Sequence, residues 1–411
     1  MKEVRIGVIG IGHISHRHMT VWSKIPGAKV VAACEVDEKK LKAWGEQYKF
    51  DEKDLYRDYR DLLARDDIDA VDVCVHNNLH TPISVAVMKA GKHCYCEKPF
   101  AGSYLDSKII YDAAKAYNVK LAVQISSIYN YQTRLAKKMV KDGKLGKIYH
   151  ARSVGYRRSM RPSVDVPFFS PAFIDKEMAG WGPMLDTGVY HISQILYILG
   201  MPELKNVYGR AHTGYYQDPG LLRGRKYEVE DLAIGIASFK NGMSMEVFED
   251  WAIHMDHVGN SYIAGSMGGL KITATDDAGG ELARNPAAAG AFGGFTPPDP
   301  DLVFYGLEND AMIETKLNCT QNQRKEGFAN PAIAPFNDNQ IHWLHYLRGD
   351  LTDETRIDTP WIALQTAKLS DGIFLSEKFG RSVTAEEIEE LSESNAMRRQ
   401  VTDWGVLEYE F

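Results

Sequence analysis

A glycine turn close to the N-terminus has the residue types and spacing needed to hold the phosphates of a dinucleotide. Gly10 and Gly12 follow the apolar run Val4 to Ile9 and precede a segment of helical character. In a strand–turn–helix unit, the first glycine permits the tight turn and the second lets the backbone approach a pyrophosphate at the helix N-terminus. Ser15 stands in the third glycine's place and is small enough for the close contact required there. The turn therefore predicts a dinucleotide site.

An acidic residue follows the second strand-like run, Lys29 to Cys34. This residue, Glu35, lies about twenty positions after the turn, where a carboxylate can accept hydrogen bonds from the adenosine ribose hydroxyls. Its charge would repel a 2′-phosphate, and no arginine directly follows it, so we expect NAD rather than NADP as the cofactor. Asp37 is an alternative ribose ligand. The competing interpretation of Glu35 is a strand-end charge that faces solvent.

Lys98 is placed to exchange a proton with a substrate hydroxyl. It follows the strand-like run Lys92 to Cys96, and parallel α/β sheets bind ligands at the carboxyl edge of their strands. Oxidation of an alcohol requires a group that takes the O–H proton while hydride leaves the carbon. Burial beside a cationic nicotinamide ring would lower the pKa of such a lysine towards neutrality. The alternative is an ordinary surface lysine in a strand-to-helix loop.

Asp186, Tyr190 and His191 are the candidate partners of Lys98. If residues 186–199 form one helix, Asp186 and Tyr190 share a face, while His191 is turned about 140° away. Tyrosine can relay a proton when a nearby cation lowers its pKa, and Lys98 would be that cation. We therefore favour Tyr190 over His191 as the proton partner. A helix that begins later would instead let His191 reach the substrate.

The elements that must position these residues change character near residue 126. Before it, strand and helix patterns alternate, which predicts a doubly wound parallel sheet. After it, longer strands alternate apolar and polar residues, which predicts a large, mostly antiparallel open sheet. The expected fold is α/β plus α+β, with a Rossmann domain at residues 1–126 and an α+β substrate-binding and oligomerisation domain at residues 127–411. The expected strands of the second domain are Ile148–Gly155, Leu204–His212, Leu232–Phe239, Met243–Trp251 and Asn260–Ala264.

Composition limits the class of protein. A chain of 411 residues is too long for one hydrophobic core, and 44% hydrophobic with 25% charged residues is typical of a globular protein. A net charge of −7 argues against a nucleic-acid partner, and no apolar run reaches the roughly 18 residues of a membrane span. We see no leader at the N-terminus, and the five cysteines indicate reduced thiols, so we expect a cytoplasmic protein.

Three separated motifs resemble the Gfo/Idh/MocA family of NAD(P)-dependent sugar oxidoreductases. Glu97-Lys98-Pro99 matches the family's E-K-P signature, and residues 73–80 look like its T-P-N-x-x-H segment, with Val75 and His76 departing from Thr-Pro. Residues 173–191 look like the segment that ends in D-x-G-x-H. The resemblance spans most of residues 1–270, with the motifs in the family's order. Most members carry D-x-x-x-H, whereas a minority similar to glucose-fructose oxidoreductase has tyrosine where this chain has Tyr190.

The resemblance implies an NAD-dependent enzyme that oxidises a secondary hydroxyl, at C3, of a pyranose or glycoside, and glycoside 3-oxidases are the nearest type. Two alternatives stay open: an NAD-dependent glycosidase that uses transient C3 oxidation, and a non-catalytic NAD-binding regulator, which the intact Lys98 disfavours. The implied catalytic residues are Lys98, Tyr190, Asp186 and His191.

The remaining expectations concern ligands and partners. We expect NAD and a sugar or glycoside as ligands, no metal, no nucleic acid and no membrane, and a homo-oligomer (dimer, tetramer or hexamer) formed through the open sheet. The glycine- and alanine-rich segment 278–300 is expected to be either a lid or a disordered or subunit-contacting loop. The expected cofactor contacts are Gly10, Gly12, His13, Ile14, Glu35, Asn77, His80, Glu97, Lys98 and Gln124. The expected substrate contacts are Tyr156, Arg157, Arg158, Lys176, Trp251 and His254.

Overall fold

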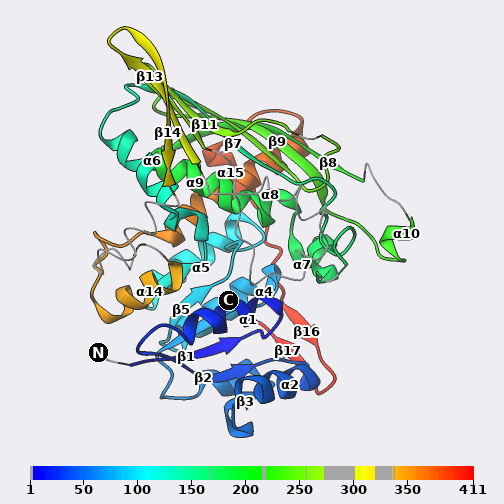
Figure 1. Ribbon diagram of the computed structural model, residues 1–411. Helices are drawn as coiled ribbons and strands as arrows, with labels where there is room; N and C mark the ends of the chain where they lie inside the picture. The colour runs from blue at the N-terminus through cyan, green and yellow to red at the C-terminus, as the bar shows by residue number, and fades with distance from the viewer. Residues whose placement is uncertain are drawn as a thin grey trace. The chain divides into compact units, whose positions relative to one another are not determined.

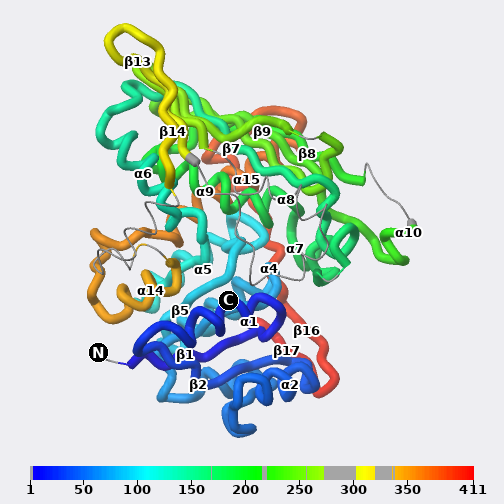
Figure 2. Tube along the Cα trace, viewed as in Figure 1, coloured from blue at the N-terminus to red at the C-terminus, as the bar shows by residue number. Residues whose placement is uncertain are grey.

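The computed structural model describes residues 3–167, 169–214, 219–255, 257–272, 301–319, 336 and 338–411 (Figures 1 and 2). The chain divides into two compact units. The first comprises Met1–Gln124, Ala334–Leu364 and Ser394–Phe411, and the second comprises Ile125–Ile333 and Gln365–Glu393. The candidate lid at residues 278–300 lies outside the described residues. Among those that are described, no helix has the length and apolar character needed to cross a membrane.

The first unit is built on a six-stranded sheet in the order β3-β2-β1-β4-β5-β6, with every neighbouring pair parallel. The central strands are buried along most of their length because helices cover both faces of such a sheet. This confirms the predicted doubly wound domain. The strands are β1 (Val4–Ile9), β2 (Ala28–Cys34), β3 (Leu55–Tyr56), β4 (Ala70–Val73), β5 (His93–Cys96) and β6 (Leu121–Val123).

The helices of this unit begin where the sequence provides caps. Asp37 accepts hydrogen bonds from the backbone of Lys39 and Lys40 and starts the second helix, while the Ser103 hydroxyl accepts from Asp106 N and starts the fifth. The helices are α1 (His13–Trp22), α2 (Glu38–Tyr48), α3 (Tyr59–Leu63), α4 (Asn77–Lys89) and α5 (Tyr104–Ala116), with a 3₁₀ turn at Glu52–Asp54.

Two segments from the C-terminal part of the chain belong to the first unit, although the predicted boundary assigned them to the second domain. In helix α14 (Asn339–Arg348), Trp343 packs in one buried cluster with Trp22 and Tyr95. The hairpin of β16 (Arg399–Val401) and β17 (Val406–Glu408) is followed by Tyr409, whose ring stacks on Tyr59. The boundary prediction was wrong here because it followed chain order, whereas these aromatic contacts join distant segments.

The second unit carries a nine-stranded sheet in the order β14-β13-β12-β11-β7-β10-β9-β8-β15. Its neighbours pair antiparallel except β7 with β10, which confirms the predicted mostly antiparallel sheet. The strands are β7 (Ile148–Tyr156), β8 (Leu204–Thr213), β9 (Glu230–Phe239), β10 (Ser244–Asp250), β11 (Ser261–Gly265), β12 (Gly268–Ile272), β13 (Asp301–Glu308), β14 (Ala311–Asn318) and β15 (Val383–Thr384).

Helices cover one face of this sheet. Gly209 and Gly235 lie so close to Ile373 that a Cβ on either glycine would come within 2.7 Å of its side chain. The helices are α6 (Tyr131–Lys141), α7 (Lys176–Ala179), α8 (Pro183–Asp186), α9 (Gly188–Ile198), α10 (Pro219–Leu222), α15 (Thr359–Phe379, in which the boundary between the units falls) and α16 (Ala385–Leu391), with 3₁₀ turns at Ser126–Tyr129 and Pro171–Ile174.

The single helix expected at residues 186–199 is divided in the structure. Helix α8 ends at Asp186 and α9 begins at Gly188, with Thr187 between them. Gly188 packs against Glu249 so closely that a Cβ there would lie 3.1 Å from Glu249 Cγ. The start of α9 therefore packs closely against β10 at a residue that has no side chain. The prediction that Asp186 and Tyr190 share one face of a single helix was wrong, because Asp186 ends α8 and Tyr190 belongs to α9.

Candidate functional site

The glycine turn has the shape that a bound pyrophosphate requires. Gly10 has φ of +86°, and a Cβ there would come within 2.6 Å of Cys74 O. Gly12 precedes the first turn of α1, and nothing among the described atoms lies within 4 Å of where its Cβ would be. Open space beside the free N–H groups of a helix N-terminus is suited to a phosphate. The turn thus fits the dinucleotide predicted from the sequence.

Glu35 follows β2 directly beside this turn. Its Oε2 accepts a hydrogen bond from Ile11 N at 3.3 Å, and its Oε1 accepts one from Asp37 N at 3.2 Å. Asp37 uses its own Oδ1 to cap α2, at 3.0 Å from Lys39 N and 3.1 Å from Lys40 N. Glu35 directly follows β2 and contacts the glycine turn, which is where a Rossmann domain binds the adenosine ribose.

Unpartnered polar atoms at the carboxyl edge of the sheet also fit a polar ligand. The Asn78 side chain, which is 1% exposed, finds no hydrogen-bond partner among the described residues for either of its polar atoms. Gln124 follows β6, and its Oε1 is buried and equally without a partner in the described part of the chain. Buried groups of this kind normally bond to protein, water or ligand. The sequence analysis predicted Gln124 as a cofactor contact. It chose Asn77 and missed its neighbour Asn78.

Glu97, which precedes Lys98, is held by a buried chain of charged groups. His18 Nε2 donates to Glu97 Oε1 at 2.8 Å, and His18 Nδ1 donates to Asp72 Oδ2 at 2.9 Å. The other oxygen of Glu97 accepts a hydrogen bond from Lys98 N at 2.9 Å. Trp22 Nε1 donates to Asp72 at 2.7 Å. This network of hydrogen bonds positions the backbone of Lys98 at the end of β5 through contacts that the sequence did not reveal.

The protonation of His18 follows from these partners. Burial alone would lower the pKa of His18, but the Asp72 carboxylate beside it prevails and holds that pKa well above its ordinary value. Both ring nitrogens face carboxylates, which only accept, so the ring is an imidazolium. His18, Asp72 and Cys74 are close enough together to suggest a metal. However, each ring nitrogen of His18 already faces a carboxylate, so the imidazolium has no lone pair to offer a metal.

His80, a predicted cofactor contact, is 1% exposed and holds the loop that follows Lys98. Its Nδ1 donates to Pro99 O at 2.7 Å, and burial lowers the pKa of the ring. Its Nε2 lies 3.2 Å from Val75 O. These contacts tie the end of β5 to the end of β4. We therefore interpret His80 as a positioning residue for the cofactor edge.

In the second unit, His191 is buried against a carboxylate that the sequence analysis missed. Its Nδ1 lies 3.0 Å from Glu249 Oε1, and Thr187 Oγ1 donates to Glu249 Oε2 at 3.2 Å. A side chain on Gly155 would collide with both His191 and Glu249. Glu249 lies two residues before the predicted contact Trp251, and the alternation of β10 turns it inward with Val247. The contact with Glu249 orients the imidazole ring of His191 through its Nδ1 atom.

Two other predicted residues of this unit, Tyr156 and Arg157, lie at the end of β7. Arg157 follows β7, and its guanidinium is 4.0 Å from Asp186 Oδ2. Tyr156 OH lies 3.0 Å from His257 Nδ1. Tyr190 O accepts from Ser127 Oγ at 2.8 Å, and its side chain is half-buried. Two further predicted contacts, Arg158 and His254, are exposed.

Trp251 is not available for the substrate contact that the sequence predicted. Its side chain is 0% exposed and packs in a cluster with Ile174, Tyr227 and Val229. No face of the indole is therefore available for a sugar ring. The prediction was wrong because residue type alone does not distinguish a core tryptophan from a binding one.

Lys176 begins α7 in a largely apolar environment. Its ammonium lies over the Trp181 ring, which is stacked on Phe374 at 3.4 Å between centroids. Burial lowers the pKa of Lys176 to about 7, and burial raises the pKa of the facing Glu230 to about 7. Glu230 also accepts from Gly182 N at 2.7 Å and Met184 N at 3.2 Å, which positions α8.

Comparison with protein families gives two adjacent matches. Residues 4–125 match a model described as an oxidoreductase family with an NAD-binding Rossmann fold, GFO_IDH_MocA. Residues 133–271 match the GFO/IDH/MocA C-terminal domain.

Curated relatives include two sugar dehydrogenases. D-glucoside 3-dehydrogenase of Escherichia coli (strain K12) is 27% identical over 251 residues, which cover 59% of this chain and 68% of that protein. Levoglucosan dehydrogenase of Pseudarthrobacter phenanthrenivorans is 30% identical over 210 residues, which cover 49% of this chain and 52% of that protein. The chain thus matches about half the length of the latter.

Solved structures share the fold. A complex of levoglucosan dehydrogenase with NADH and levoglucosan has a TM-score of 0.73 at 21% identity, over 93% of this chain and 100% of that one. Aldose-aldose oxidoreductase from Caulobacter crescentus, complexed with glycerol, has a TM-score of 0.68 at 21% identity, with the same coverage of both chains.

Proposed function

Because this chain belongs to the Gfo/Idh/MocA family of NAD-dependent oxidoreductases, we propose that it oxidises the C3 hydroxyl of a pyranose or glycoside to a ketone. The activity on sugar CH–OH groups follows from the family, and the carbon and substrate are the proposal. The observation that supports this proposal most directly is the position of Lys98 at the carboxyl end of β5, where Lys98 N donates to Glu97. The relative named D-glucoside 3-dehydrogenase supports the choice of C3.

We assign one role to each of the predicted residues. NAD, when bound at the glycine turn and Glu35, supplies the hydride acceptor. Lys98 takes the proton of the substrate hydroxyl, and Tyr190 shares it. His191, fixed by Glu249, orients the substrate, while Arg157 and Lys176 bind its other hydroxyls. An aldopyranoside offers donors and acceptors around its ring that match such side chains.

The test of this proposal follows both products and the position of oxidation. Purified enzyme is incubated with NAD and a panel of methyl glucosides, C-glycosides and levoglucosan, with NADH followed by absorbance and ketone by mass spectrometry. We expect equal amounts of NADH and ketone, a slower reaction with 3-deuterated substrate, and no reaction with the matched 3-deoxy sugar. Release of aglycone without net NADH would identify the glycosidase alternative. Absence of turnover across the panel would favour the regulator.

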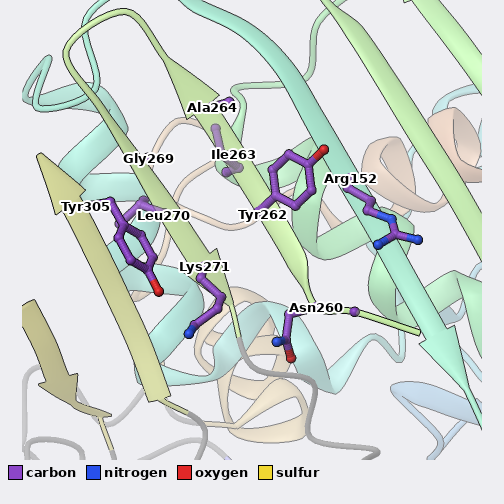
Figure 3. A pocket seen from close by; sticks show the side chains of 10 residues that line it. Arg152, Asn260, Tyr262, Ile263, Ala264, Gly269, Leu270, Lys271 and Tyr305 are labelled. Carbon is purple, nitrogen blue, oxygen red and sulfur yellow. The ribbon is translucent and has the colours of Figure 1, made fainter. Parts of the chain in front are cut away.

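We also propose that the face of the nine-stranded sheet that none of the described helices covers is buried in a homo-oligomer. Tyr208 and Ile236 are paired neighbours on β8 and β9 and are 46% and 57% exposed. On the same sheet, Tyr262 and Tyr305 line a shallow hollow of about 430 Å³ together with Arg152 (Figure 3). An aromatic and aliphatic surface of this kind is typical of a subunit interface.

The oligomer is tested by light scattering at micromolar concentration. We expect the unmodified protein to be a dimer or larger, and Ile236→Asp to shift it towards the monomer because a charge is costly in an apolar interface. Tyr117→Asp is the matched control, since Tyr117 is an exposed aromatic outside the sheet. A monomeric unmodified protein would remove the proposal.

A further inference from the structure

The C-terminal segment of the chain follows the carboxyl edge of the six-stranded sheet. Asn395 N donates to Asp106 Oδ2 at 2.9 Å, and Met397 N donates to Asn78 O at 2.8 Å, where α4 begins after β4. The segment then forms the β16–β17 hairpin, which lies beside α2 in the first unit (red in Figures 1 and 2). This is the edge at which a Rossmann sheet binds its dinucleotide.

A hollow separates this hairpin from the turn that follows β2. Its volume is about 410 Å³. Glu35, the candidate ribose ligand, immediately precedes one of its walls, so the hollow adjoins the position of the adenosine ribose. The hollow is lined on one side by Val36, Asp37, Glu38 and Lys39, and on the other by Gln400, Val401, Thr402 and Asp403.

Arg57 ties the two walls together. Its guanidinium donates to Val36 O at 2.9 Å and to Glu38 Oε2 at 3.4 Å, and it forms an ion pair with Asp403. The same group lies 5.7 Å from the centre of the Trp404 ring. With these partners, the Arg57 guanidinium is turned towards the hairpin and the β2 turn.

The hairpin is anchored well enough to act as a wall. Leu407 and Tyr409 are buried, and the Tyr409 ring stacks on Tyr59. Tyr409 OH donates to Gln400 Oε1 at 2.6 Å, and Thr402 N donates to Gly405 O at 2.8 Å. These contacts fix the loop that presents Asp403.

We propose that the C-terminal hairpin forms a wall of the adenosine site and that Asp403 makes this site selective for NAD by holding Arg57. Arginine beside the ribose is the usual partner of the 2′-phosphate of NADP. Here Arg57 is engaged, and Asp37, Glu38 and Asp403 place three carboxylates against the single ammonium of Lys39 in the lining. A 2′-phosphate entering the hollow would therefore meet net negative charge, whereas the 2′-hydroxyl of NAD would not.

The experiment measures binding without any sugar, so its outcome is independent of the proposed substrate. Isothermal titration compares AMP with 2′,5′-ADP, and NAD with NADP. The unmodified protein should bind the unphosphorylated ligand of each pair more tightly. In Asp403→Asn this preference should fall about fivefold, because one repelling charge is lost and Arg57 is released. The matched control is Glu408→Gln, which removes the same charge from the hairpin outside the hollow and should leave the preference within twofold.

Two further measurements separate the parts of the proposal. The double variant Asp403→Asn/Arg57→Ala should lose the gain in 2′,5′-ADP binding, and retention of that gain would overturn the role of Arg57. In the unmodified protein, AMP should slow hydrogen–deuterium exchange in residues 399–404. Unchanged exchange there would overturn the wall, and an unchanged ligand preference in Asp403→Asn would overturn the selectivity.

Discussion

Replacing Lys98 with alanine should lower the rate of hydride transfer at least ~100-fold, which is the usual loss when a general acid or base is removed. The affinity for NAD should stay close to that of the unmodified enzyme, because the glycine turn and Glu35, after β1 and β2, are expected to hold the pyrophosphate and the adenosine ribose without Lys98. Single-turnover formation of NADH and a separate titration with NAD measure the two quantities. An equal loss of NAD binding would show that Lys98 acts mainly by holding the cofactor.

Tyr190→Phe should produce a similar loss if the two residues share one proton. The double variant Lys98→Ala/Tyr190→Phe should then be little slower than either single variant, because residues that act as a unit are not additive. Independent contributions would instead multiply. Such multiplication would contradict a shared proton.

His191→Ala is the matched control. Nδ1 of His191 already contacts the Glu249 carboxylate, so we expect His191→Ala to change KM more than kcat. If His191→Ala abolishes turnover while Tyr190→Phe is nearly silent, histidine is the proton partner. The division of the helix at Thr187 removed the geometric argument against His191, so these variants decide the assignment.

His18→Ala should lower the free energy of unfolding by about 3–5 kcal/mol, because it leaves the buried Asp72 and Glu97 carboxylates facing each other without a cation. Chemical denaturation measures this loss. His16→Ala, two residues earlier on the same helix, is the control. His16 is only half-buried and bonds to Tyr48 OH, so its loss should cost less than about 1 kcal/mol.

The stability difference between the unmodified protein and His18→Ala should decrease as the pH rises. The pKa of His18 is raised in the folded protein, so its stabilising charge is fully present below the unfolded value of about 6.5. The contribution is lost as the pH rises through the raised folded value. The stability difference between the unmodified protein and His18→Ala should therefore be largest near pH 6 and shrink in alkaline solution. A difference that grows with pH would contradict the imidazolium.

Local sequence patterns were sufficient to predict the parallel sheet and the cofactor end of the site. Gly10, Gly12 and Glu35 are recognisable because a glycine turn and an acidic strand end are each encoded within a few residues. Lys98 could be placed with them because the carboxyl ends of parallel strands meet at one edge of the sheet. The open sheet of the second unit was predictable in the same way, since alternation along each strand marks a sheet with one uncovered face.

Other features depended on contacts between residues far apart in the chain. His18 meets Asp72 and Glu97 across separations of 54 and 79 residues, and Arg57 meets Asp403 across 346. The burial of Trp251, the division of the helix at Thr187 and the return of the C-terminal hairpin to the first unit are likewise results of packing. By itself, the sequence determined the parallel sheet, the glycine turn and the strand ends that carry Glu35 and Lys98. Only the tertiary structure decided which groups neighbour these residues, because long-range packing, rather than any periodicity along the chain, selects the partners of a buried charge or aromatic ring.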